Sequence, residues 1–437
     1  FDWYSKSQAT RASDKNMSGA TAAVRLDARD NTEYGLVRTY VEVMFDRQLG
    51  TDYAGSWNRR AMLINPTAQG ASTSAVSGNY MNVFQSLNVS NAYVQMGGLT
   101  AGRLASSVQP PLPLLSYTKA YGSAGPVNQA TYTVALGNGF SITGGIEDNR
   151  ELREGILTGA GDAVYKLDTT IVNTSLLSTS ASIQTITKLD GYKARFTRTS
   201  SNTPEAVLSL DLAQSWGKVK LAGSVAEVTA NDASISTKTA YSVGGGLGLN
   251  LDMLAKGSAI TIGGTYASGM TYRTAGQTTD AGNGPGSFSF MRVGTSGSDA
   301  VIDANNNMSL VKSYAFGGVL NHQFTPTVNA YIGASYAKMD YTTAQSTAVG
   351  SWTLAGTATV GGQTTTGKVQ ANPYYYAPIE AGFVWTPISG LTVQPSVTYA
   401  LVGAKYRSGA VPGFTSTSED KTHDSAWITR IKVARSF

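Results

Sequence analysis

Charged side chains recur at alternate positions in two segments near the start of the chain. Arg25 and Asp27 share one face of the first segment, and Arg38 and Glu42 share one face of the second, while apolar residues occupy much of the opposite face. A period of two is typical of strands whose two faces meet different surroundings. Charges along such a face could line a narrow water-filled path and focus the field that sorts ions. The chemistry open to these residues is therefore electrostatic.

Residues that usually carry catalysis or bind metals are scarce. The sequence has no Cys, and its two histidines, His322 and His423, lie far apart without an acidic cluster nearby. The run Gly244–Gly248 is not followed by Lys and does not open a helix, unlike a phosphate-binding loop. The 33 basic and 28 acidic residues give a net charge of +5, and no basic run occurs, so a nucleic-acid partner is not indicated. We expect no enzyme activity, no cofactor and no metal.

The same alternation continues to the end of the chain and predicts an all-β protein. Only 14% of the 437 residues are charged, against about 25% in typical soluble domains. No run of about 20 apolar residues occurs, which excludes a helical membrane protein. We predict strands at 20–29, 35–45, 86–96, 99–104, 130–137, 140–147, 204–214, 218–228, 238–251, 258–268, 310–324, 327–341, 376–386, 391–402 and 425–437.

The connections between these strands alternate in length. Short polar turns, such as 137–139, 215–217 and 325–327, alternate with long polar stretches. Transmembrane β-barrels show this asymmetry, with tight turns at one end and long external loops at the other. We therefore expect a single barrel domain over 1–437. The long stretches lie near 46–78, 105–129, 148–203, 269–309, 342–375 and 403–424, and aromatic residues suited to interfacial girdles include Phe45, Phe140, Trp216, Phe324, Tyr336, Phe383, Trp385 and Trp427.

The last segment combines alternation with a terminal aromatic residue. Trp427, Ile431 and Val433 share one face, and the chain stops at Phe437. This ending resembles the signal that the outer-membrane assembly machinery of Gram-negative bacteria reads. We expect these four residues to serve as an assembly signal.

Three further segments resemble the alphaproteobacterial trimeric porins. They are 20–43 (ATAAVRLDARDNTEYGLVRTYVEV), 91–103 (NAYVQMGGLTAGR) and 130–148 (ATYTVALGNGFSITGGIED). The resemblance implies a 16-stranded antiparallel transmembrane β-barrel, a homotrimer, and a loop folded into each pore. It also implies residues upstream of Phe1, and contact with neighbouring subunits through 46–78.

The resemblance further implies a constriction between the barrel wall and the loop 105–129. Wall candidates are Arg25, Arg38, Glu42 and Arg103; loop candidates are Tyr117, Lys119 and Tyr121. Residues 104–146 contain no Asp or Glu, so no loop carboxylate balances the basic wall. We expect weak selectivity or a preference for anions, unless acids near the next loop, such as Glu147, Asp148, Glu151 and Glu154, reach inward.

These expectations converge on a passive diffusion channel in the outer membrane of a Gram-negative bacterium. Its partners would be membrane lipid, lipopolysaccharide and the assembly machinery. Two alternatives remain open: a solute-specific channel for an anionic or sugar substrate, and a structural or adhesive surface barrel with a plugged lumen.

Overall fold

A computed structural model gives the fold. It describes residues 2–6, 16–33, 35–49, 83–110, 126–150, 152–158, 162–168, 186–193, 196–197, 203–230, 232–274, 298–303, 306–342, 345, 373–404 and 423–437. In these ranges no helix is both long and apolar enough to cross a membrane.

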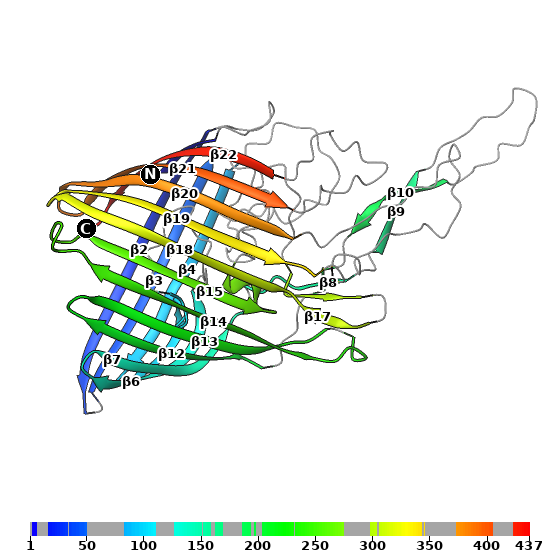
Figure 1. Ribbon diagram of the computed structural model, residues 1–437, viewed down its shortest axis with the longest axis horizontal. Helices are drawn as coiled ribbons and strands as arrows, with labels where there is room; N and C mark the ends of the chain where they lie inside the picture. Colours follow the sequence, from blue (N-terminus) through cyan, green and yellow to red (C-terminus); the bar gives the residue numbers. More distant parts are fainter. Residues whose placement is uncertain are drawn as a thin grey trace, which may run out of the picture.

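Long antiparallel strands form the wall of a β-barrel (Figure 1). Each wall strand pairs with the next wall strand along the chain, and β1 pairs with both β2 and β22. The wall strands are β1 (Asp2–Lys6), β2 (Asn16–Thr32), β3 (Gly35–Leu49), β4 (Val83–Met96), β5 (Leu99–Leu104), β6 (Val127–Gly137), β7 (Phe140–Asp148), β12 (Glu205–Gln214), β13 (Gly217–Val228), β14 (Lys238–Asn250), β15 (Ala259–Ser268), β18 (Lys312–Thr325), β19 (Val328–Asp340), β20 (Tyr374–Ile388), β21 (Leu391–Ala404) and β22 (His423–Arg435).

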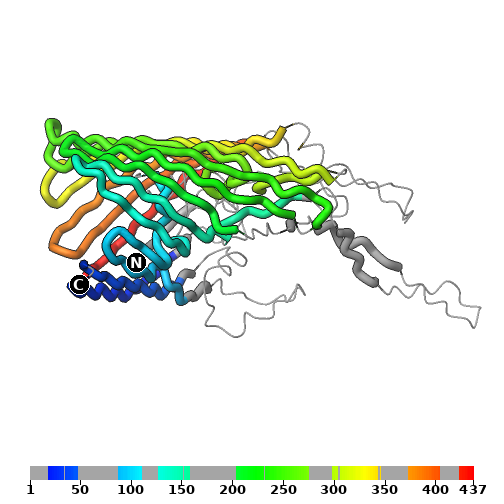
Figure 2. Tube along the Cα trace, turned by 90° about the horizontal axis from the view of Figure 1, so that it is seen from below, coloured from blue at the N-terminus to red at the C-terminus, as the bar shows by residue number. Residues whose placement is uncertain are grey.

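This arrangement confirms the predicted all-β, antiparallel architecture. The predicted segment at 20–29 lies within β2, which extends beyond it at both ends, and the segment at 35–45 begins where β3 begins and ends before it. The tight connections gather at one end of the barrel, as Figures 1 and 2 show. At the turn between β6 and β7, Gly137, Asn138 and Gly139 all have positive φ, which glycine adopts readily and asparagine tolerates.

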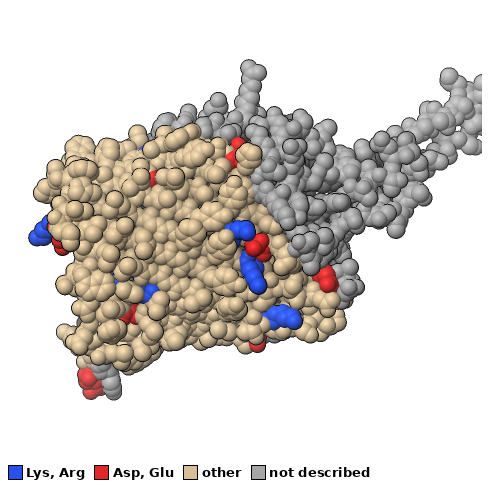
Figure 3. Space-filling view, in the orientation of Figure 1, with Lys and Arg blue, Asp and Glu red and all other residues tan. Residues whose placement is uncertain are grey.

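The outward surface of the wall is apolar. In β12, Leu208 and Leu210 are exposed, whereas Val207 and Ser209, which alternate with them, are buried. Leu221, Val243, Ile262, Phe316 and Ile332 continue the exposed apolar surface on the following strands. Figure 3 shows a broad face of the molecule with few charged residues. Exposed apolar surface of this extent marks contact with another apolar phase, and in a barrel that phase is lipid.

Aromatic side chains lie on this outward surface toward both ends of the strands. Near the tight turns, Phe140, Trp216 and Phe324 are exposed. Toward the other end, the ring centroid of Tyr336 lies 6.2 Å from that of Tyr314 and 5.8 Å from that of Tyr375. Two aromatic zones along the strand direction are the arrangement that membrane interfaces favour.

Short elements from two long connections, β7 to β12 and β15 to β18, pack against the inner side of the wall, at the end away from the tight turns (Figure 1). They are β8 (Ile156–Thr158), the 3-10 helix η3 (Thr271–Arg273), β16 (Ala300–Ile302) and β17 (Met308–Leu310), and we call them the inner layer. β8 pairs with β11 (Phe196–Thr197) and, in parallel, with β16, which pairs with β17. A separate hairpin joins β9 (Asp162–Asp168) to β10 (Ile186–Lys193).

The inner layer forms a hydrophobic core with the wall. Ile156, Met270 and Ala300 belong to one buried cluster with inward-facing Val228 and Ala240. We predicted 148–203 and 269–309 as external loops, but parts of both therefore lie against the inner surface of the barrel. Their polar composition concealed this, because the buried contacts come from short apolar runs such as Ala300–Ile302.

Candidate functional site: the charged wall of β2 to β4

The lumen wall is open to solvent along β2. Every residue from 20 to 33 is exposed, so both faces of this strand are accessible. On β13 and β14, by contrast, inward-facing residues such as Ala226 and Ala240 are buried beneath the inner layer. Among the described residues, the solvent-accessible part of the lumen therefore runs beside β2.

Arg25 and Glu42 form an ion pair on this open wall. They are register partners on β2 and β3, and Nε of Arg25 donates to the Glu42 carboxylate. Glu42 also accepts hydrogen bonds from the Tyr40 hydroxyl, at 3.2 Å, and from the Asn91 side chain, at 3.3 Å. The Arg25 side chain is 59% exposed and that of Glu42 10%. The arginine thus faces water, and the glutamate holds it in place.

Asp27 binds two arginines farther along the same strands. Its carboxylate accepts hydrogen bonds from Arg38 at 2.9 and 3.0 Å and from Arg29 at 2.9 Å. Arg38 also donates to the Gln95 side chain at 3.4 Å. A two-point fork between guanidinium and carboxylate fixes direction as well as distance, so Arg38 is held along the wall.

An aromatic pair supports Arg38. Tyr40 and Tyr93 are register partners on β3 and β4, and their ring centroids lie 5.3 Å apart. The Arg38 guanidinium carbon lies 5.4 Å from the Tyr40 ring centroid and 5.7 Å from that of Tyr93, within the range of cation–π attraction. The wall therefore presents a fixed cation beside two aromatic rings.

The ion-paired cluster on this wall, which consists of Arg25, Arg29, Arg38, Asp27 and Glu42, is slightly positive. Its three arginines and two acids leave +1. Asp46, farther along β3, faces the same side and accepts a hydrogen bond from Thr21 at 2.6 Å, so it adds a third negative charge to the wall. The register brings Arg25, Arg38 and Glu42 together on one face and adds Asp27 as a partner of Arg38, and their role at a constriction stays a prediction.

Arg103 does not belong to this group. It pairs in register with Ala92 on β4 and Asn128 on β6. Ala92 shares a face with the exposed Val94, and Asn128 with the exposed Tyr132, whereas Tyr93 and Gln129 point to the other face. The register therefore places Arg103 on the outward side, which corrects the prediction. Tyr117, Lys119 and Tyr121 lie outside the described residues.

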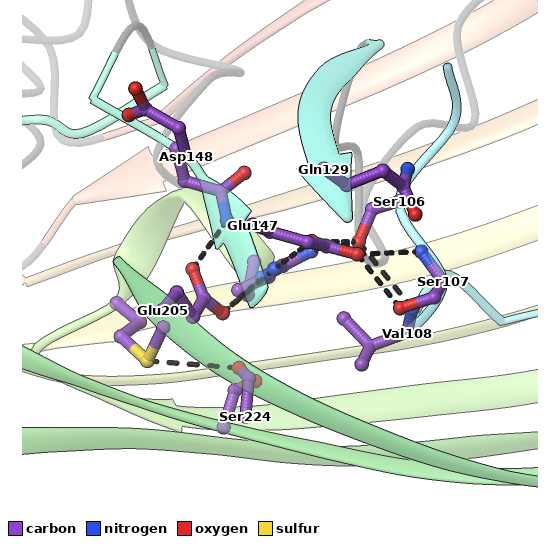
Figure 4. A network of polar contacts seen from close by, with 12 residues as sticks. Ser106, Ser107, Val108, Gln129, Glu147, Asp148, Glu205 and Ser224 are labelled. Carbon is purple, nitrogen blue, oxygen red and sulfur yellow. Dashed lines mark hydrogen bonds and ion pairs between the residues drawn. The ribbon is translucent and has the colours of Figure 1, made fainter. Parts of the chain in front are cut away.

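The two carboxylates at the end of β7, Glu147 and Asp148, are paired with donors close to them. Glu147 accepts hydrogen bonds from Ser106 at 2.7 Å, from the Ser107 amide at 2.8 Å and from Arg273 at 2.9 Å (Figure 4). Asp148 pairs with Arg150. Neither acid is available to offset the charge of the β2 wall. Glu151 lies outside the described residues.

Sequence analysis missed the buried cluster around Arg273. Besides Glu147, this guanidinium binds Glu205 at 2.7 Å and Ser106 at 2.7 Å, and both glutamates are buried. Burial alone would lower the pKa of Arg273, but the charges of Glu205 and Glu147 outweigh it and raise the pKa above its usual value. No local motif marks these residues, because 126 positions separate Arg273 from Glu147.

The chain that leaves β5 also turns along the inner wall. Val108 packs against Val207 and Ala222, which face inward from β12 and β13. Gln129 donates to the carbonyl of Ala105 at 2.8 Å and so holds the base of this segment against β6. Across the described ranges, no group of three or more His, Cys, Asp or Glu side chains is arranged to hold a metal.

Comparisons with known proteins place this geometry in a family. A search of curated proteins found no match. Among solved structures, the outer-membrane channel DcaP of Acinetobacter baumannii is 12% identical, with 97% of this chain and 98% of that chain covered and a TM-score of 0.49. OprB of Pseudomonas putida is 12% identical, with 100% of this chain and 93% of that chain covered and a TM-score of 0.47. OmpF of Salmonella typhi in complex with daunomycin is 11% identical, with 100% of this chain and 96% of that chain covered and a TM-score of 0.46.

The family model described as "Porin subfamily" matches residues 3–428, which is nearly the whole chain. The barrel wall, the exposed apolar surface and the charged lumen agree with this match. The chain therefore belongs to the porin subfamily and is a β-barrel diffusion channel of the Gram-negative outer membrane.

Proposed function

We propose that this chain forms a closed, 16-stranded barrel through which ions and small hydrophilic solutes diffuse passively along the β2 to β4 wall. The observation that carries the proposal is the exposed row of Arg25, Asp27 and Arg38 opposite an inner layer that fills part of the lumen. A charged, wetted wall beside a packed one leaves a narrow aqueous path. In such a path fixed charges act on permeating ions.

The pore is proposed to narrow further where the 105–129 loop enters it. The packing of Val108 on Val207 supports an inward course at the start of that loop. The resemblance to alphaproteobacterial trimeric porins supports a homotrimer that embeds in lipid and lipopolysaccharide. Trp427, Ile431, Val433 and Phe437 are proposed as its signal to the assembly machinery. Trp427 and Ile431 are exposed on the outward face of β22.

The proposed selectivity is a weak preference for anions. The ion-paired cluster of Arg25, Arg29, Arg38, Asp27 and Glu42 carries a net +1, and Glu147 and Asp148 are already paired with Arg273 and Arg150. A single net charge biases the ion population without excluding either sign. The channel would turn over no substrate and need no cofactor.

Single-channel recording in a planar bilayer tests this proposal. Under a potassium chloride gradient we expect open steps that close in threes, and a reversal potential of the sign that chloride preference gives. A clear potassium preference would contradict the selectivity. Folded protein without any conductance would contradict the channel and favour a plugged surface barrel.

A second function is favoured by the aromatic pair beside Arg38. A planar cation next to stacked rings could retain a solute that carries both an anionic group and a flat apolar part. Flux that saturates with the concentration of such a solute would support a solute-specific channel. Flux that rises linearly with concentration would support the general pore.

A further inference from the structure

Arg273 joins three separate parts of the chain through one buried guanidinium. Nη1 donates to Ser106 Oγ at 2.7 Å, Nη2 donates to Glu147 at 2.9 Å and to Glu205 at 2.7 Å, and Nε donates to Glu205 at 3.2 Å. Its partners lie after β5, on β7 and on β12 (Figure 4). Only 2% of Arg273 is exposed.

The same residue belongs to the inner layer. Its neighbours Met270 and Tyr272 are fully buried in the hydrophobic core. The Thr271 amide donates to Asp299, next to β16, at 2.9 Å, and the Tyr272 hydroxyl donates to Glu205. Any displacement of η3 would therefore disturb both the core and the polar contacts. The guanidinium connects the inner layer to the wall on one side and to the segment 106–110 on the other.

A purely stabilising role does not explain this choice of residues. Buried ions lose their hydration, and well-packed apolar side chains often stabilise a protein as much or more. What a guanidinium adds is direction, because its rigid fork can bind several acceptors at fixed angles. Here the acceptors come from different strands and from the base of the segment that follows β5. The arrangement is suited to fixing the position of these parts relative to one another.

We propose that Arg273 is a positioning residue for permeation. It holds the inner layer and the segment 106–110 against the wall from β6 to β15, and so fixes the cross-section that remains beside β2 to β4. This inference rests on the proposed channel function. It assigns the control of pore width to a residue that lies outside the charged wall.

The test uses substitutions that keep every buried charge paired. Arg273→Lys retains the positive charge but cannot reproduce all four hydrogen bonds, because its single ammonium nitrogen has three N–H groups and lacks the planar fork. Ser106→Ala removes the hydroxyl that accepts from Arg273 and donates to Glu147, and it leaves both ion pairs intact. Arg150→Lys is the matched control, since Arg150 pairs only with Asp148 among the contacts described and its side chain is 69% exposed. Folding of each variant is checked by its heat-modifiable mobility on gels.

Two measurements separate positioning from stability. Hydrogen exchange at the Ser107 and Thr271 amides reports whether the anchored segments are held. We expect exchange in Arg273→Lys to be faster by roughly 10- to 100-fold, the factor that follows from losing one hydrogen bond to a charged group. Single-channel recording reports the pore, and we expect altered mean conductance and greater open-channel current variance in Arg273→Lys and Ser106→Ala. Arg150→Lys should match the wild type in both.

Faster exchange with unchanged conductance and variance would overturn the inference, because the anchor would then be structural only. Unchanged exchange and unchanged conductance would overturn it as well. If Arg273→Lys does not fold, Ser106→Ala decides the same comparison. Folded wild type without conductance would instead overturn the channel function, and the inference with it.

Discussion

Asp27 accepts a two-point fork from Arg38, with donor–acceptor distances of 2.9 and 3.0 Å across β2 and β3. The same carboxylate binds Arg29. One acidic side chain therefore restrains two of the three arginines on the open wall. The positions of two of the positive charges that a permeating ion meets therefore depend on this residue.

Replacing Asp27 with Asn should strengthen the preference for anions. The substitution removes one of the two negative charges in the ion-paired cluster and raises the net charge of the cluster from +1 to +2. One unit charge a few ångströms from an aqueous ion path changes local ion populations by roughly twofold to threefold. The reversal potential in a salt gradient measures the change. Asp252→Asn, in the connection after β14, is the control and should leave the potential as it is.

A charge on the outward face should destabilise the barrel in a way that depends on depth. Ile262 is 50% exposed near the middle of β15, whereas Met253 is 90% exposed at the β14–β15 connection. Arg at a midplane position costs about 2–4 kcal/mol, and near the interface about 0–1 kcal/mol. Urea unfolding in lipid vesicles should therefore show a large loss for Ile262→Arg and a small one for Met253→Arg. Equal losses would show that Ile262 does not meet hydrocarbon.

The turn between β6 and β7 offers a test of steric crowding against backbone strain. Gly137 and Gly139 both have positive φ, at 90° and 76°. A Cβ at Gly139 would lie 1.9 Å from the carbonyl oxygen of Ala213, whereas a Cβ at Gly137 would meet nothing within 4 Å. Gly137→Ala should cost about 1–3 kcal/mol through strain alone. Gly139→Ala should cost more, and thermal unfolding of the two variants should rank them in that order.

Asp299 should make the inner layer more stable in mild acid. Burial raises its pKa from 3.8 to about 6, although hydrogen bonds from Thr271 and the charge of Arg153 oppose the rise. The folded state therefore binds the proton more tightly than the unfolded state, so stability falls as pH rises from about 4 to about 6. Below that window the proton is bound in both states and the dependence ends.

Amide exchange at Thr271 across this pH window measures the effect, after correction for the intrinsic pH dependence of exchange. We expect a change on the order of 2 kcal/mol in the opening free energy of wild type. Asp299→Asn should flatten the profile. Asp303→Asn, in the same connection but half-buried and bonded to Asn307, should retain it. A flat wild-type profile would contradict the prediction.

The wall was predictable from the sequence because its signals are local. The alternation of apolar and polar residues over 20–29 and 35–45 indicated that the two faces of β2 and β3 meet different surroundings. It assigned Arg25 and Glu42 to the polar faces, which the register brings together. The turn at 137–139 was predictable because glycine and asparagine suit positive φ. Each of these inferences needs only residues within one strand or one turn.

The prediction that Arg103 faces the lumen was wrong because alternation alone did not identify the inward face. Alternation shows that a strand has two faces but does not say which face is inward. In short β5 the lumen side is set by the pairing of Thr100 with Gln95 and of Gly102 with Tyr93. Only the register with β4 reveals that Arg103 falls on the other side. The Arg273 cluster was hidden more completely, since its partners lie 68 and 126 positions away.

The wall and the inner layer differ in how far apart their partners lie in the chain, and this affects the order in which they can form. Most neighbouring wall strands are joined by a turn or a single loop, so each hairpin closes at modest entropic cost. β8 and β16 pair only after most of the chain between them has been placed. Contacts across long separations form late in folding. The hairpins of the wall therefore form first, and the pairing of β1 with β22 and the packing of the inner layer, whose partners lie farthest apart in the chain, follow them.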